Sequence, residues 1–240
     1  MADFKTHVTV AAALSAPLSA SAFIAGFATM NDAIFYALAG TLGGLLPDID
    51  SDESLAIRLV FRLISALVAG LTIAFWLEKL AHWQVLVAAI ASYLVMRFPI
   101  KWVFEQLTIH RGTLHSLLAN IMFAAVSVPL AYHVFKLSAK TAWGIGAFVF
   151  FGAMIHLILD EIYSIELSGM RVKRSFGTAL KLTDWGEPLA SFVLVIACAV
   201  GYLFSPDASA WQASLTWLPQ PEHAIAWLTK EWHHLQLYWG

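Results

Sequence analysis

The stretch TAWGIGAFVFFGAMIHLIL, residues 141–159, decides the fold class of this chain. It contains no Asp, Glu, Lys or Arg, and its length is close to the roughly 20 apolar residues that a helix needs to cross a bilayer. We therefore predict a membrane-spanning helix here. One ionisable side chain, His156, lies inside the run and Asp160 follows it directly, and ionisable groups at membrane depth are costly and generally functional.

The composition of the whole chain also indicates a membrane protein. Of its 240 residues, 60% are hydrophobic and 12% are charged, whereas a soluble domain carries about 25% charged residues. The net charge of −2 argues against a nucleic-acid partner. Because Cys198 is the single cysteine, a disulfide framework and a cysteine-based zinc site are excluded, so metal ligands would be histidine and carboxylate.

Six further apolar runs lie on either side of the first. They cover residues 8–28, 33–46, 57–77, 82–104, 114–135 and 188–204. Together these runs predict an all-α, polytopic transmembrane helical bundle of six or seven spans. The run 33–46 is short and broken by glycines, so we expect a half-helix or a tightly packed short span.

The runs also suggest how the chain is organised. We expect residues 1–204 to form a single transmembrane domain that carries the functional site. Residues 205–240 contain five tryptophans among polar residues, which is typical of an amphipathic segment that lies on the membrane surface. The sequence does not indicate an oligomeric state.

The distribution of basic residues predicts the orientation. If the short run 33–46 crosses fully, ten of the fourteen Lys and Arg residues fall on one side of the membrane. Basic loops stay in the cytoplasm, so we predict a cytoplasmic N-terminus and an external C-terminal tail.

Four polar clusters interrupt the apolar runs, and this topology places all four on the cytoplasmic side. Their candidate metal ligands are His7, Asp48, Asp50, His110, His115, His156 and Asp160. Imidazole and carboxylate bind zinc, manganese or iron where no thiolate is available. His156 and Asp160 are four residues apart, so a helix brings both side chains to one face. Seven ligands exceed the needs of one tetrahedral ion, which favours two ions that share a carboxylate over one ion with supporting partners.

Each cluster alone also has a simpler explanation. His7 near a terminus is more often an interfacial residue, and Asp48 and Asp50 after Pro47 are compatible with a solvated turn. His110 and His115 are compatible with a corner that contacts lipid headgroups. The presence of all four clusters at the ends of predicted spans favours the metal site.

The ordered motifs resemble those of a known family. They are His7, the string Leu45-Leu46-Pro47-Asp48-Ile49-Asp50, the string His110-Arg111-Gly112-Thr113-Leu114-His115-Ser116, and His156-Leu157-Ile158-Leu159-Asp160. This set is similar to the YdjM-like family of LexA-regulated, inner-membrane-associated, metal-dependent hydrolases, over about residues 6 to 165. The resemblance implies a multi-pass protein of the bacterial inner membrane whose seven motif residues bind one or two divalent ions, and it implies hydrolase activity.

We therefore predict a metal-dependent hydrolase that acts on an ester or phosphoester, with a membrane phospholipid as a plausible substrate at this depth. Asp50 or Glu161 is the candidate proton acceptor. Arg111, Lys173 and Arg174 are candidates for binding an anionic group, although Lys173 and Arg174 equally fit a simple positive-inside signal.

Two alternatives remain open from the sequence alone. The same His and Asp residues suit a metal-ion or proton-coupled transporter, whose ligands we would expect near the midplane with access from both sides. A scaffold without catalysis would use the Trp-rich tail to bind a partner. The position of the clusters near the ends of the spans favours hydrolysis.

Overall fold

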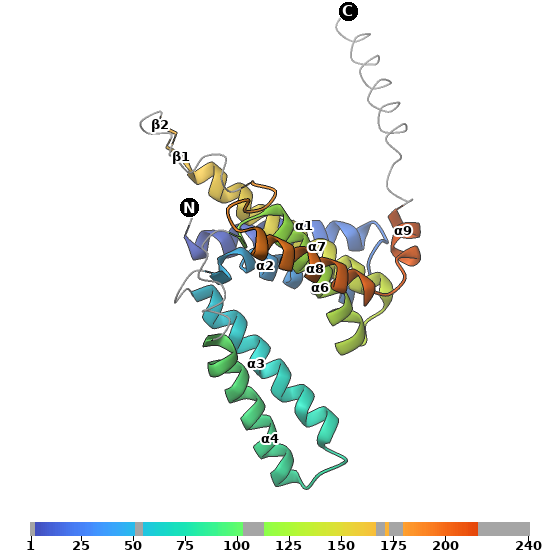
Figure 1. Ribbon diagram of the computed structural model, residues 1–240. Coiled ribbons are helices and arrows are strands. Elements are labelled where there is room, and N and C mark those ends of the chain that lie inside the picture. Colours follow the sequence, from blue (N-terminus) through green and yellow to red (C-terminus); the bar gives the residue numbers. More distant parts are fainter. Residues whose placement is uncertain (1–2, 51–54, 103–112, 167–170, 173–179, 216–240) are drawn as a thin grey trace, which may run out of the picture.

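The computed structural model describes residues 3–50, 55–102, 113–166, 171–172 and 180–215. Nearly all of these residues are helical, and Figure 1 shows their arrangement. The elements in chain order are α1 (Phe4–Ile24), α2 (Met30–Gly43), the 3-10 turn η1 (Leu46–Asp50), α3 (Leu55–Trp76), α4 (His82–Val95) with its π-helical extension η2 (Met96–Ile100), α6 (Leu117–Pro129) with its extension η3 (Leu130–Val134), α7 (Ala139–Tyr163), the strands β1 (Ile165–Glu166) and β2 (Arg171–Val172), α8 (Pro188–Leu203) and α9 (Ser209–Leu215).

The predicted all-α membrane bundle is confirmed. Within the described residues, five helices are long and apolar enough to cross a membrane by length and composition; they are Phe4–Ile24, Ile57–Trp76, His82–Ile100, Leu117–Val134 and Ala139–Tyr163. The helices α2 and α8 are apolar but shorter. Large apolar side chains such as Phe98 and Phe192 stay more than half exposed on the outer faces, as expected for surfaces in contact with lipid.

The first helix begins earlier than the apolar run predicts. Its N-cap is Asp3, whose carboxylate accepts a hydrogen bond from the Thr6 amide at 2.9 Å. We expected His7 just before the span, but this cap places His7 inside α1, where it is buried. Beyond Ile24 the chain turns at Gly26, which has a positive φ of 74°.

Glycines let α2 lie against α7 with the two backbones in direct contact. A Cβ atom on Gly152 would collide with the carbonyl oxygen of Gly40, and one on Gly43 would collide with the carbonyl of Val149. The short glycine-broken run is therefore a tightly packed short helix, which is one of the two forms that we expected. This contact holds the end of α2 beside the middle of α7.

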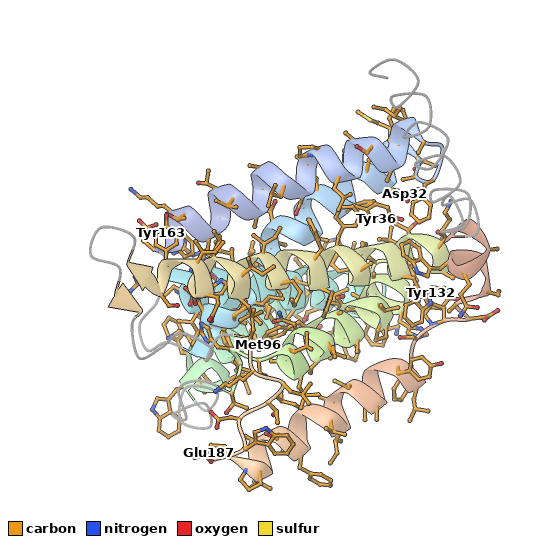
Figure 2. All side chains as sticks on the ribbon, turned by 90° about the horizontal axis from the view of Figure 1, so that it is seen from above. Asp32, Tyr36, Met96, Tyr132, Tyr163 and Glu187 are labelled. Carbon is orange, nitrogen blue, oxygen red and sulfur yellow. The ribbon has the colours of Figure 1, made fainter. Side chains whose placement is uncertain are left out.

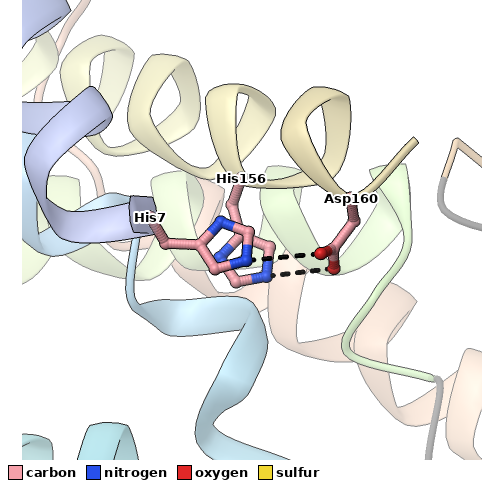
Figure 3. A group of neighbouring side chains, drawn as sticks. All are labelled: His7, His156 and Asp160. Carbon is pink, nitrogen blue, oxygen red and sulfur yellow. Dashed lines mark ion pairs between the residues drawn. The ribbon is translucent and has the colours of Figure 1, made fainter. Parts of the chain in front are cut away.

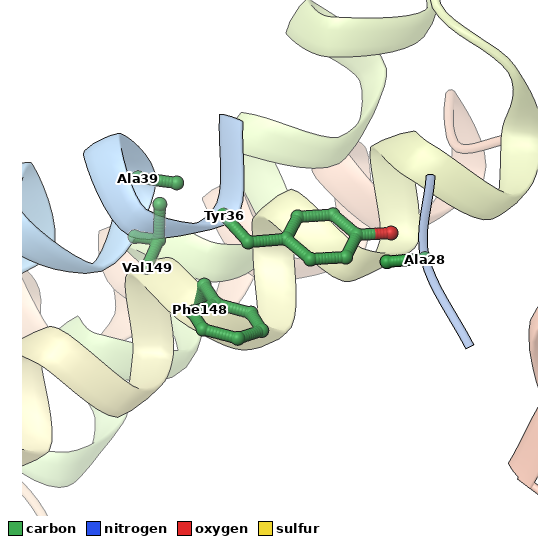
Figure 4. Packing of buried hydrophobic residues seen from close by; sticks show 5 residues of the cluster. All are labelled: Ala28, Tyr36, Ala39, Phe148 and Val149. Carbon is green, nitrogen blue, oxygen red and sulfur yellow. The ribbon is translucent and has the colours of Figure 1, made fainter. Parts of the chain in front are cut away.

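A hydrophobic cluster fixes the same pair of helices away from that end. It consists of Ala28, Tyr36, Ala39, Phe148 and Val149, drawn in Figure 4. The Tyr36 and Phe148 rings stack with centroids 4.9 Å apart. Aromatic packing of this kind adds about 0.5–1.5 kcal/mol beyond the buried area, so α2 and α7 are held together at two points.

The α3–α4 hairpin diverges from the other helices, as Figure 1 shows. The two helices are joined to each other by a hydrogen bond from the Thr72 hydroxyl to the Ser92 hydroxyl, at 3.1 Å. A small cluster of Ile49, Ile57 and Phe61 anchors the start of α3 beside η1. The hairpin is therefore attached to the bundle near its base.

The C-terminal part beyond residue 204 is described only in part. The short helix α9 lies in it, and residues 216–240 lie outside the described residues. The surface-bound tail and the division of the chain at residue 204 remain predictions.

Candidate metal centre

Five of the seven predicted ligands meet at one end of the bundle, although they come from four separate parts of the chain. His7 comes from α1, Asp48 from η1, His115 from the residues just before α6, and His156 and Asp160 from α7. Figure 2 shows that α7 ends at this side with Tyr163, whereas Asp32, at the start of α2, lies at the other end. The cluster is therefore near one surface of the bundle and away from its middle.

Local structure fixes each of these side chains. One turn of α7 separates His156 from Asp160, so both leave the helix on the same face. Ser116 is the N-cap of α6: its hydroxyl donates to the Thr113 carbonyl at 2.7 Å and accepts from the Ala119 amide at 3.2 Å. This cap sets the backbone immediately next to His115.

Two imidazole nitrogens lie close to two carboxylate oxygens. The Nε2 atom of His115 is 3.3 Å from Asp48 Oδ1 and 3.8 Å from Asp160 Oδ2. The Nε2 atom of His156 is 3.5 Å from each of the same two oxygens. All four residues are buried except Asp48, whose side chain is 21% exposed. Asp48 is thus the member of the group that solvent or a ligand can reach.

A hydrogen bond fixes the tautomer of His156. Its Nδ1 atom lies 2.8 Å from the Gly44 carbonyl oxygen, which can only accept, so Nδ1 carries the proton. In the neutral ring Nε2 is then an unprotonated acceptor, and it faces two carboxylates. Within the described residues this atom has no hydrogen-bond partner. Such an arrangement needs a cation, either a second proton on the ring or a metal ion.

The separations fit a metal ion. Ions of the zinc type bind nitrogen and oxygen at about 2.0–2.2 Å, so donors that share one ion are about 3.0–3.5 Å apart. Three of the nitrogen-to-oxygen distances here, 3.3, 3.5 and 3.5 Å, fall in this range, and the fourth, from His115 to Asp160, is longer at 3.8 Å. The backbone carbonyl on the distal ring nitrogen of His156 is also a common support for a metal-binding histidine. These residues can therefore hold a divalent ion.

Asp48 is ionised at neutral pH. Burial raises the pKa of this carboxyl, but the adjacent His115 and His156 rings lower it by more, so the pKa lies below the ordinary value for aspartate. The group thus offers a negatively charged oxygen to a cation.

His7 forms a second group with the same α7 residues, as shown in Figure 3. Its ring stacks on the His156 ring with centroids 3.6 Å apart and planes within 10°. The His7 Nε2 atom lies 3.3 Å from Asp160 Oδ1, while His156 faces Oδ2. The carboxylate of Asp160 therefore has an imidazole at each of its two oxygens.

Comparison with known proteins identifies the family. The sequence matches the family of the YdjM inner membrane protein over residues 1–219. The chain belongs to the YdjM inner membrane protein family. No curated protein and no solved structure matches it. Family membership, together with the apolar helices, makes this chain a multi-pass protein of the inner membrane.

The other predicted site residues of this family member lie elsewhere or outside the described residues. His110, Arg111, Lys173 and Arg174 lie outside them, and so does the side chain of Asp50. Glu161 follows Asp160 on α7 and is half-buried. It leaves the helix about 100° further round, on a different face from Asp160.

One feature of the site and one buried polar residue on α6 have little signal in the sequence. The Gly44 carbonyl that orients His156 is a backbone group, and only the run of glycines before Pro47 hints at a close approach there. Asn120 is fully buried on α6 and its side-chain amide contacts the Met154 sulfur at 3.6 Å. Its place in an otherwise apolar run is the signal that could have drawn attention to it.

Proposed function

We propose that this chain is an integral-membrane, metal-dependent hydrolase that acts on an ester or phosphoester of a membrane lipid. The observation that carries the proposal is the Nε2 atom of His156, which faces Asp48 and Asp160 in a buried cluster of imidazoles and carboxylates. A bound zinc, manganese or iron ion would supply a Lewis acid and a water of lowered pKa.

Each residue of the cluster has its own proposed role. The Gly44 carbonyl holds the His156 ring in one orientation, and the short distance to His7 keeps Asp160 in place. Asp48 is the most exposed of the five ligands, so a substrate approaches from its side. Asp50 and Glu161 are our candidates to accept the proton of the attacking water.

The location of the cluster supports a lipid substrate. It lies at one end of a membrane bundle, near the level at which the headgroups of phospholipids are concentrated. We propose that the anionic headgroup is bound by Arg111, which follows His110 in the sequence, and by Lys173 and Arg174, which come after α7. We also propose that this end and the N-terminus face the cytoplasm, because most basic residues belong to these loops.

Packing below the cluster favours hydrolysis over transport. A transporter needs a passage that leads from the ligands through the membrane. On the membrane side of the cluster, α2 and α7 are in backbone contact, since a Cβ on Gly152 would collide with Gly40. Asp160 also lies only three residues from the end of α7.

The proposal is tested with purified full-length chain in detergent and in lipid nanodiscs. We expect zinc, manganese or iron by elemental analysis, together with release of a product from a total lipid extract that a chelator abolishes. His156→Ala should lose both properties. The matched control is His133→Ala, because His133 bonds the Phe204 carbonyl at the opposite end and should not affect either. Bound metal without turnover of any lipid, combined with metal uptake into proteoliposomes, would favour transport.

A further inference from the structure

An apolar groove lies beside the bundle, between the diverging helix α3 and the helices α2, α6 and α7. Its volume is about 590 Å³, which is within the range of about 300–1,000 Å³ that is usual for ligand pockets. Figure 1 shows α3 leaving the bundle at this place. The groove is separate from the metal cluster and contains none of its residues.

The side chains that line the groove are almost entirely apolar. Every lining side chain but that of Ser127 is aliphatic or aromatic, and the Ser127 hydroxyl already donates to the Ala124 carbonyl at 2.8 Å. Small buried residues, Ala39 and Ala131, contribute to the floor. A ligand that fits here has no need for polar partners.

The walls of the groove are not covered by the protein itself. Leu38 is 56% exposed, Leu63 47% and Phe135 52%, although all three line the same hollow. In a membrane protein, exposed apolar side chains of this kind face the lipid. Because the chain is a multi-pass inner-membrane protein and α3, α6 and α7 are candidate spans, the apolar molecules available at this depth are the acyl chains of lipids.

The groove also lies at a suitable distance from the cluster. Val149, on its wall, precedes His156 by seven residues on α7, which is about 10 Å along the helix axis. The groove continues away from the cluster to Ile145 and to Leu137, beyond the end of η3. A lipid whose headgroup bond reaches Asp48 would therefore have its acyl chain at the level of the groove.

We propose that this groove binds one acyl chain of a membrane lipid and holds the headgroup end of that lipid toward the metal cluster. The statement that the bound lipid is the substrate rests on the proposed hydrolase function. The binding of the acyl chain does not rest on that function, so acyl-chain binding and hydrolysis can each be refuted without the other.

Photolabelling of the full-length chain tests the groove. The protein is reconstituted in vesicles of phosphatidylethanolamine and phosphatidylglycerol, with a phosphatidylglycerol that carries a diazirine in one acyl chain. It is extracted into detergent, so that loosely held lipid exchanges, and is then irradiated and mapped by peptide mass spectrometry. We expect the label to concentrate on the peptides of α2 and α3 that contain Leu38 and Leu63.

A tryptophan in the groove should displace the lipid. In Leu63→Trp the larger side chain fills part of the hollow, and labelling should fall about tenfold. The matched control is Leu94→Trp, because Leu94 is 46% exposed on α4 and does not line the groove. Metal content should be unchanged in both variants.

The outcomes are distinguishable. Label spread evenly over all helices, or equal labelling in Leu63→Trp and Leu94→Trp, would overturn the groove whether or not a lipid is hydrolysed. Absence of label from the peptides of α2 and α3 would overturn it as well. Specific labelling without turnover of any lipid would leave the groove standing and refute the hydrolase.

Discussion

The substitution Asp160→Asn separates a metal site from a network of hydrogen bonds. The carboxylate of Asp160 faces three imidazoles, with His7 at Oδ1 and His115 and His156 at Oδ2. Asparagine keeps the shape and the ability to accept one hydrogen bond, but it removes the negative charge and one acceptor oxygen. A network without metal has no metal-dependent stability to lose, whereas a metal site would lose a charged ligand.

The size of the effect follows from the number of ligands. A structural zinc ion bound by four ligands contributes about 10–16 kcal/mol, so one of four donors is worth about 2.5–4 kcal/mol. We expect the dissociation constant of the ion to rise about 10²- to 10³-fold, since each 1.4 kcal/mol is about tenfold. At a metal concentration about 100 times the wild-type constant, the stabilisation by the ion would fall from about 2.7 to about 0.4 kcal/mol or less.

Thermal unfolding with and without added metal measures this difference, and elemental analysis measures the bound ion. The matched control is Asp32→Asn at the other end of the bundle, where the carboxylate accepts hydrogen bonds from Thr29 and from the Thr141 hydroxyl. This variant should keep both the ion and the metal-dependent shift in Tm. Equal metal content and an equal shift in Asp160→Asn and in wild type would refute the reasoning.

Three further predictions follow from the same contacts. His7→Ala should lower the metal content from two ions per chain to one, because His7 faces only the Oδ1 side of Asp160; a content that stays at two ions, or one ion in both wild type and variant, would contradict this. Metal affinity should fall as the pH drops, because a protonated imidazole nitrogen cannot bind a metal ion, and titration by competition with a chelator measures it; a flat profile from pH 8 to 5 would contradict this. Gly152→Ala should lower the Tm by an amount that corresponds to about 1–3 kcal/mol, because the new methyl group collides with Gly40. Gly70→Ala is the control: a methyl group there meets open space, so the Tm should rise slightly. A thermal melt in which Gly152→Ala is more stable than Gly70→Ala would contradict the packing.

Much of the fold is predictable because each helix is specified locally. Runs of about 20 apolar residues without charges have few alternatives in a membrane, so all seven predicted runs are helical in the described residues. The convergence of the ligands at one end is also predictable, since the spacing of the spans decides on which side each polar cluster falls. The proximity of the His156 and Asp160 side chains follows from the helical repeat alone.

Other features depend on contacts between distant residues and had no local signal. The tautomer of His156 is set by the backbone of Gly44, which is 112 residues away in the sequence. The close contact between Gly40 and Gly152 can be recognised only once the relative position of α2 and α7 is known. The apolar groove likewise arises from the angle between α3 and the bundle, which no stretch of sequence specifies alone.

The most direct test of the central claim is anomalous diffraction from crystals of the wild-type chain grown with zinc or manganese, collected at the absorption edge of that metal. The account predicts a strong anomalous peak among the Nε2 atoms of His115 and His156 and the carboxylates of Asp48 and Asp160. Clear density for these side chains at their close distances, with no anomalous peak between them, would contradict it.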